Sequence, residues 1–96
     1  MSPKNQKKLN LIRAKLDKLD NKLLSLIKKR TSLVNEVLKL KVVKKEIVDK
    51  KRINFILKKI QGKSKKLNID PRITKRIWKN MIWSYIDYER RNFKKK

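Results

Sequence analysis

The most constraining feature of this chain is a run of regularly spaced apolar residues in its first half. Residues 9–41 read LNLIRAKLDKLDNKLLSLIKKRTSLVNEVLKLK, and apolar side chains recur there at alternating spacings of three and four, at Leu9, Ile12, Leu16, Leu19, Leu23 and Leu26. Such spacing is typical of a long helix that packs against other helices along one seam. The next seam position holds Arg30, after which apolar residues resume at Leu33, Val37 and Leu40.

Arg30 needs an explanation, because a cation left unpaired in a helical core costs several kcal/mol. It is either a structural residue, snorkelling or paired with a carboxylate of another helix, or part of an anion-binding site. Lys41 follows eleven residues later, on nearly the same side of the helix and roughly 16 Å further along its axis. Arg13 lies roughly 25 Å before Arg30 and about 100° round the axis. One straight helix cannot bring Arg13 and Arg30 to one small ligand, whereas a second, antiparallel copy could.

The composition limits the chemistry that the chain can perform. With 96 residues it is expected to form a single domain, 1–96, and it contains neither Cys nor His. Disulfides, thiolate sites, thiol catalysis and the usual general base and metal ligand are therefore excluded. The 31 Lys and Arg against 8 Asp and Glu, a net charge of +23, favour anionic partners such as nucleic acid, anionic lipid or a small polycarboxylate. No signal peptide or membrane span is recognisable, so we expect a cytoplasmic protein without a membrane partner.

The first helix is expected to end at Val43 or Lys44, because β-branched residues at 42–43 and 47–48 weaken helix propensity. A loop is predicted at 44–48. Ser2-Pro3 is a possible helix entry, but the polar tails 1–8 and 91–96 are expected to fray.

Two further helices complete an all-α fold of three helices with a long first helix. Asp49 is a suitable N-cap for the second helix, which runs toward Leu67 through an unfavourable Gly62. Asp70 followed by Pro71 is the expected start of the third. Glu89 falls on the apolar stripe of that third helix, and a carboxylate there either neutralises Arg30 or belongs to a site.

Together, Arg13, Arg30, Lys41, Arg52 and Glu89 are candidates for one site, and the pattern resembles the all-helical chorismate mutase family, which includes the isochorismate-pyruvate lyases. The resemblance runs from about residue 9 to residue 89. The matching segments are LIRAKLDKLDNKLLSLIKKR at 11–30, VLKLK at 37–41, VDKKR at 48–52 and NIDPRITKRIWKNMIWSYIDYE at 68–89.

The resemblance implies an intertwined helical homodimer in which Arg13 is donated to the site of the partner protomer. Arg13 and Arg30 would hold the two carboxylates of a small dicarboxylate substrate, chorismate, through charge-assisted hydrogen bonds. Arg30, Lys41 and Glu89 would be the catalytic residues, with Lys41 on the ether oxygen whose bond breaks. The remaining substrate-binding residues would be Asp49, Arg52, Tyr85, Val37, Ile82 and Ile53.

The implied reaction is the intramolecular [3,3] rearrangement of chorismate to prephenate in aromatic amino-acid biosynthesis. It needs no nucleophile, metal, cofactor or general base, so a chain without His and Cys can perform it. It requires a compact substrate conformer and donors aimed at the oxygen that gains charge in the transition state.

Two positions depart from the mutase pattern. The Glu89 position is often Gln in the family, and a carboxyl group can donate a hydrogen bond to the ether oxygen only when it is protonated. Many mutases carry Glu at the Ile53 position, and an apolar residue there also resembles the lyases, which convert isochorismate to salicylate and pyruvate. The lyase is therefore kept as the alternative function.

Two other classes explain the sequence less well. A nucleic-acid-binding protein would account for the charge of +23, Trp78, Trp83 and the basic tail. The aromatic residues fall largely within the helical pattern of the third helix, however, and no binding motif is visible, so no specific nucleic-acid partner is expected. A structural coiled coil would explain neither Arg30 nor Glu89 on apolar stripes.

Overall fold

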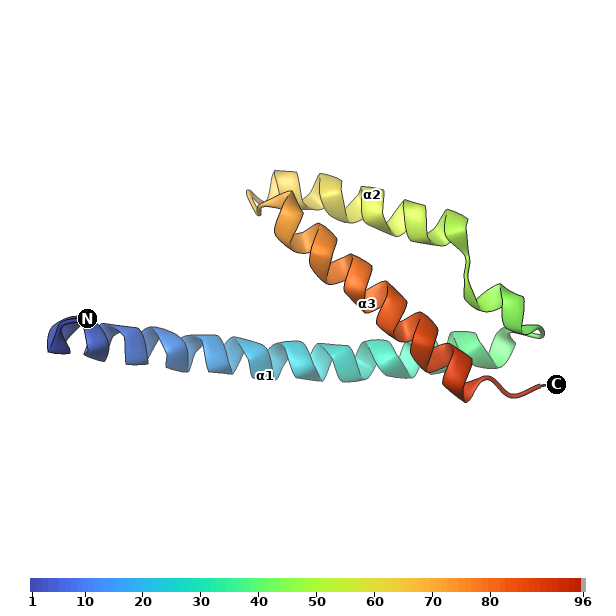
Figure 1. The fold of residues 1–96 in the computed structure, drawn as a ribbon, viewed down its shortest axis with the longest axis horizontal. Helices are drawn as coiled ribbons and strands as arrows, with labels where there is room; N and C mark the ends of the chain where they lie inside the picture. Colours follow the sequence, from blue (N-terminus) through green and yellow to red (C-terminus); the bar gives the residue numbers. More distant parts are fainter. Residues whose placement is uncertain (96) are drawn as a thin grey trace. The chain divides into compact units, whose positions relative to one another are not determined.

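The computed structural model describes residues 1–95 and consists of three α-helices and a short 3-10 helix, without strands in this range (Figure 1). The elements are α1 (Pro3–Leu40), η1 (Lys44–Ile47), α2 (Lys50–Lys66) and α3 (Pro71–Asn92). The predicted all-α class with a long first helix is confirmed. The chain divides into two compact units, Met1–Leu33 and the residues from Val34 onward.

The N-terminal tail, residues 1–8, which is expected to fray, is helical from Pro3 in the structure. The Ser2 hydroxyl accepts a hydrogen bond from the backbone N–H of Asn5 (3.2 Å), and the Ser2 carbonyl accepts one from Gln6 (2.8 Å). Pro3, which lacks an N–H, opens the first turn. Ser2-Pro3 is thus the helix entry, and this N-cap holds the first turn together.

The other end of α1 comes earlier than predicted, at Leu40 and not at Val43 or Lys44. The Glu46 carboxylate accepts hydrogen bonds from the backbone N–H groups of Val42 (3.3 Å) and Val43 (3.1 Å). These bonds replace the helical ones that the two β-branched residues would have made. The predicted loop at 44–48 contains the 3-10 helix η1.

Helix α2 begins as predicted and passes through its glycine without a break. The Asp49 carboxylate accepts a hydrogen bond from the Arg52 backbone N–H (3.0 Å), which makes Asp49 the N-cap. Gly62 lies inside the helix, and no atom lies within 4 Å of the place where its Cβ would be. No close packing therefore requires a glycine at this position.

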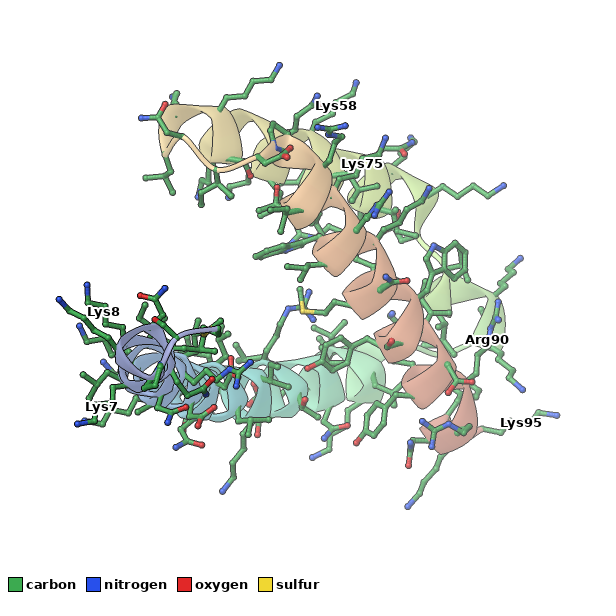
Figure 2. The ribbon with its side chains drawn as sticks, turned by 60° about the vertical axis from the view of Figure 1, so that its left-hand side comes forward. Lys7, Lys8, Lys58, Lys75, Arg90 and Lys95 are labelled. Carbon is green, nitrogen blue, oxygen red and sulfur yellow. The ribbon has the colours of Figure 1, made fainter. Side chains whose placement is uncertain are left out.

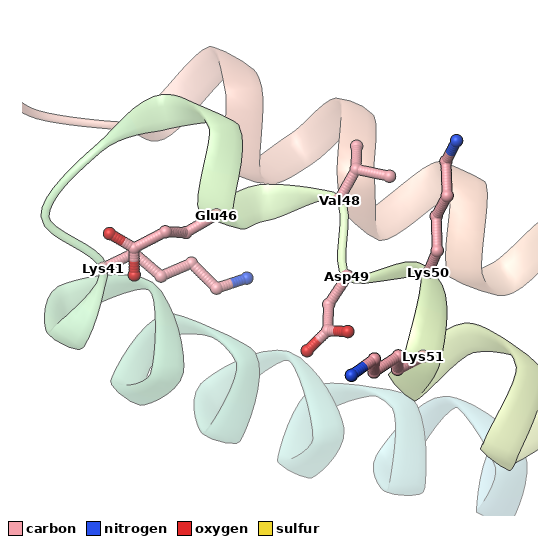
Figure 3. A pocket seen from close by; sticks show the side chains of 6 residues that line it. All are labelled: Lys41, Glu46, Val48, Asp49, Lys50 and Lys51. Carbon is pink, nitrogen blue, oxygen red and sulfur yellow. The ribbon is translucent and has the colours of Figure 1, made fainter.

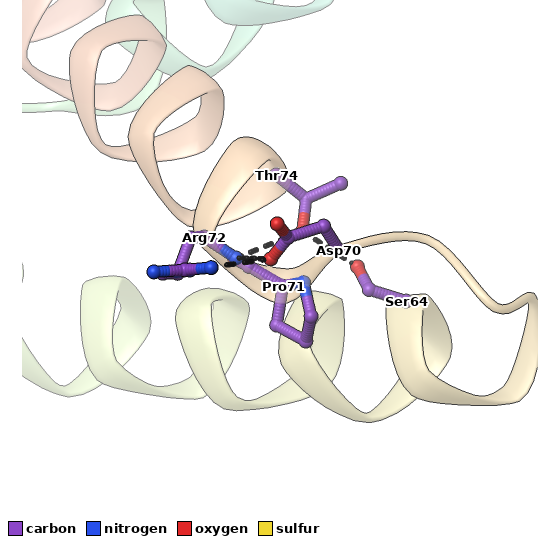
Figure 4. A network of polar contacts seen from close by, with 5 residues as sticks. All are labelled: Ser64, Asp70, Pro71, Arg72 and Thr74. Atoms are coloured by element: carbon purple, nitrogen blue, oxygen red, sulfur yellow. Dashed lines mark hydrogen bonds and ion pairs between the residues drawn. The ribbon is translucent and has the colours of Figure 1, made fainter.

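The turn between α2 and α3 is built from specific backbone and side-chain contacts (Figure 4). Asn68 adopts the left-handed conformation (φ 56°), and the Ile69 N–H donates to the Ser64 carbonyl (2.9 Å). Asp70 then caps α3 by accepting from the Arg72 backbone N–H (2.9 Å), with Pro71 in the first turn. This confirms the boundary predicted at residues 68–71. The chain reverses here, so that α2 and α3 form a helical hairpin (Figure 1).

Two kinds of contact hold the second unit together. Its apolar core consists of Leu38, Ile47, Ile82 and Ile86, with Val48, Ile53, Ile56, Leu57 and Phe93 packed against it. Near the turn, the buried hydroxyl groups of Ser64 and Thr74 are hydrogen-bonded to each other (2.7 Å), and Ser64 also donates to the Ile60 carbonyl (2.6 Å). Both side chains are small, so α2 and α3 can approach closely there.

At the other end of the chain, where residues 91–96 are expected to fray, α3 extends into the start of this tail. α3 continues to Asn92, where Arg91 pairs with Asp87 (2.9 Å) and the Asn92 amide donates to the Tyr88 carbonyl (2.8 Å). Residues 93–95 are not helical, and Lys96 lies outside the described residues.

The first unit is a single helical segment whose apolar seam is exposed. From Ile12 to Leu26 the exposed fractions on this stripe are close to one half, between 52% at Leu16 and 59% at Leu26, whereas Leu9 is half-buried. Exposure of a long regular apolar stripe on one helix is typical of a surface that another chain covers.

Candidate functional site

Two of the predicted catalytic residues meet in the second unit. The Lys41 ammonium lies 3.0 Å from the Glu89 Oε1 atom, and the side chains are 16% and 7% exposed. Lys41 directly follows the end of α1, and Glu89 lies in the last turns of α3. Glu89 lies on the apolar stripe of α3 and points inward, where it meets Lys41, which is 48 residues away in sequence.

This contact identifies the counter-ion of the buried carboxylate. The observed ion pair of Glu89 is with Lys41, and a contribution of Arg30 to its neutralisation stays a prediction. A buried charge of this kind is tolerated only when it is paired. An ammonium has three protons, so donation to Glu89 leaves Lys41 two donors for another acceptor.

Lys41 and Asp49 line one cavity of about 510 Å³ (Figure 3). Its other lining residues are Glu46, Val48, Lys50 and Lys51. Figure 3 shows the Lys51 side chain pointing toward the Asp49 carboxylate and Lys50 pointing away from it. The Asp49 carboxylate is engaged by the Arg52 backbone N–H, so its position is fixed by the start of α2.

Glu46 and Val48 were not among the predicted site residues. Glu46 fixes the segment after α1 by accepting from the backbone of Val42 and Val43, and so it helps to orient the end of the helix from which Lys41 extends. The sequence signal was weak, because a capping glutamate is normally recognised by a Ser or Thr three residues earlier and this position is Val43.

The remaining predicted residues of the second unit occupy different environments. The Arg52 guanidinium lies over the Phe55 ring, 5.4 Å from its centroid. Ile82 is buried in the core, and Ile53 packs against that core. Val37 is about half exposed (49%), and Tyr85 is half-buried. Their contact with a substrate stays a prediction.

Arg13 and Arg30 both belong to the first unit, where they lie on α1. Arg13 is exposed and Arg30 is half-buried. Their place in a shared site with Lys41 is likewise a prediction.

Among residues 1–95, no three His, Cys, Asp or Glu side chains lie close enough together to hold a metal ion. None of the helices in this part of the chain combines the length and apolarity that crossing a membrane requires.

Comparison with known proteins identifies the family. The family model described as chorismate mutase type II matches residues 12–90. This chain belongs to the chorismate mutase type II family. No curated protein and no solved structure gave a significant match. The matched region of this chorismate mutase type II domain includes every residue that the sequence assigned to the site, from Arg13 to Glu89.

Proposed function

We propose that the chain is a chorismate mutase that rearranges chorismate to prephenate by holding the substrate in a compact conformer and stabilising charge on its ether oxygen. The observation that carries this proposal is the Lys41–Glu89 ion pair at 3.0 Å in a chorismate mutase type II domain. It supplies a fixed, partly desolvated cation where the reaction needs one.

Lys41 is the proposed donor to the ether oxygen. As the carbon–oxygen bond breaks, negative charge accumulates on that oxygen, and an ammonium that is already oriented stabilises the charge without reorganisation. Glu89 keeps the ammonium in one place by accepting one of its protons. Because Lys41 is only 16% exposed, the interaction is screened less than it would be in water.

The substrate carboxylates require further cations, which we assign to Arg13 and Arg30. The exposed seam of the first unit, with Leu16 and Leu19 about half exposed (52% and 54%), suits a second copy of the same helix. In such a homodimer, Arg13 of one protomer completes the site of the other. Each site then combines Arg30 and Lys41 of one protomer with Arg13 of the partner.

Glu89 has a second proposed role that depends on its proton. In the ion pair the carboxylate accepts from Lys41, whereas donation to the ether oxygen requires a protonated carboxyl group. A Glu89→Gln variant separates the two roles, because an amide can donate to the ether oxygen but cannot pair with Lys41 as an anion. Mutase activity that is kept or raised in this variant supports the donor role. Loss of activity would contradict the donor role and leave Glu89 as the group that holds Lys41.

The isochorismate-pyruvate lyase remains the second candidate because of Ile53. In the structure Ile53 packs against the core, so its apolar character has a structural reason that is independent of the substrate. This weakens the argument for the lyase from that position.

A turnover assay on chorismate and isochorismate in parallel tests the proposal. Prephenate should form from chorismate, and an Arg30→Ala variant with matched helical content should lose this activity. Salicylate and pyruvate formed from isochorismate at a clearly higher kcat/KM would assign the lyase instead. Inactivity of the parent on both substrates would overturn both assignments.

A further inference from the structure

A second cavity lies in the helical hairpin, near the turn that joins α2 to α3. It measures about 400 Å³ and is lined by Asn54, Leu57, Lys58, Gln61, Pro71, Arg72 and Lys75. We call it the hairpin cleft. It shares no lining residue with the cavity at Lys41, and its volume falls in the range of small-molecule sites.

Three of the lining side chains are cations and none is an acid. Lys58 comes from α2, and Arg72 and Lys75 come from α3. Figure 2 shows Lys58 and Lys75 extending from neighbouring parts of the hairpin. In residues 1–95 neither lysine has an ion-pair partner. Three cations around one cleft repel one another, and an anion bound between them would relieve that repulsion.

Arg72 is an exposed side chain with one long ion pair to Asp70. Its Nε atom lies 3.7 Å from the Asp70 Oδ1 atom, and its backbone N–H donates to the same carboxylate (2.9 Å) (Figure 4). The ion pair engages the Nε end of the guanidinium, so the terminal amino groups can form the paired hydrogen bonds that suit a phosphate group. The N-terminus of α3 lies at the same cleft but is already capped by the Asp70 carboxylate, so the positive charge of the cleft comes from its three cationic side chains.

The rest of the lining determines what the anion is attached to. Leu57 and Pro71 are half-buried and supply an apolar wall, whereas Asn54 and Gln61 supply amide donors and acceptors. A bare ion would leave the apolar wall uncovered. We propose that the hairpin cleft binds a phosphate group attached to a compact apolar body, a site separate from the proposed mutase site.

The test is a titration with phenyl phosphate at constant ionic strength, followed by NMR chemical shifts of the backbone amides around Lys58, Arg72 and Lys75. The cleft variant is Lys58→Gln with Lys75→Gln. The control variant, Lys7→Gln with Lys8→Gln, removes the same charge from exposed positions on α1 (Figure 2). Both variants keep the residues of the proposed mutase site, and matched helical content is checked by circular dichroism.

We expect saturable chemical-shift changes that are confined to the cleft. The affinity for phenyl phosphate should fall about tenfold or more in the cleft variant, which loses two charge-assisted hydrogen bonds, and less than about twofold in the control variant. Inorganic phosphate should bind more weakly than phenyl phosphate, because it does not cover Leu57 and Pro71. Shifts that do not saturate, or equal losses in both variants, would show a diffuse charge effect and overturn the site. So would equal binding of the two phosphates.

A short oligothymidylate distinguishes the source of the phosphate. If the oligothymidylate binds at the same cleft residues but with a lower affinity per phosphate than phenyl phosphate, the natural ligand is a small phosphorylated molecule. Tighter binding that spreads to the amides of α1 and falls steeply with salt would assign the charge to nucleic-acid backbone binding and overturn the small-molecule site.

Discussion

Removing the Lys41 side-chain charge should destabilise the fold through Glu89. In a Lys41→Met variant, a carboxylate that is 7% exposed would lose its cation at 3.0 Å, while the methionine keeps most of the buried hydrocarbon. Breaking a buried pair by removing one partner costs about 3–5 kcal/mol. Because Lys41 itself is 16% exposed, water can partly solvate the remaining charge, and we expect a loss near the lower limit, about 3 kcal/mol.

The free energy of unfolding from urea denaturation at one fixed protein concentration measures this loss. A Lys41→Met, Glu89→Gln double variant serves as the control, because it removes both charges and should recover about half of the lost stability or more. Equal stability of parent and single variant at neutral pH, or no recovery in the double variant, would refute the ion pair as a structural contact.

Three further changes test the fold and the turn. Gly62→Ala should raise the free energy of unfolding by about 0.5–1 kcal/mol, because the added methyl group meets no atom within 4 Å and the helix gains propensity; destabilisation in urea would contradict this. Thr74→Val should lower it by about 1 kcal/mol, because the Ser64 hydroxyl loses its 2.7 Å partner, and a neutral effect in the same assay would argue against that bond. Tyr88→Phe removes a 2.9 Å hydrogen bond to Asn35 and should also cost about 1 kcal/mol; an unchanged urea midpoint would count against a stabilising role for it.

The sequence predicted the helix boundaries well where a capping residue has a familiar local signature, and less well where that signature is lacking. Asp49 and Asp70 were recognisable as N-caps because a carboxylate next to a helix start has a local signature. The end of α1 was placed too late, because it depends on the Glu46 carboxylate binding two backbone N–H groups, for which Val43 gives no signal.

Lys41 and Glu89 were both predicted as site residues, but their pairing was not predicted. Apolar periodicity placed Glu89 inward, and family resemblance selected Lys41, but neither indicated that the two would form an ion pair across 48 residues. That contact requires the path of the chain between α1 and α3. The hairpin cleft could not be predicted from the sequence for a similar reason. Lys58 and Lys75 lie on different helices, and only the turn between α2 and α3 places them at one cleft. Cytoplasmic localisation and the homodimer stay predictions.

The central claim is that one chorismate site is built from two copies of this chain, and mixing two inactive variants tests it most directly. Arg13→Ala and Arg30→Ala proteins are each assayed for prephenate formation, then unfolded together, refolded as a mixture and assayed again. A mixed dimer would contain one site with both arginines and one with neither, so an equal mixture should recover about a quarter of the parent activity. We predict that each variant is inactive alone and that the refolded mixture is active. A site shared between two protomers would be contradicted if either variant were active alone. It would also be contradicted if the mixture recovered no activity although mass spectrometry demonstrated mixed dimers.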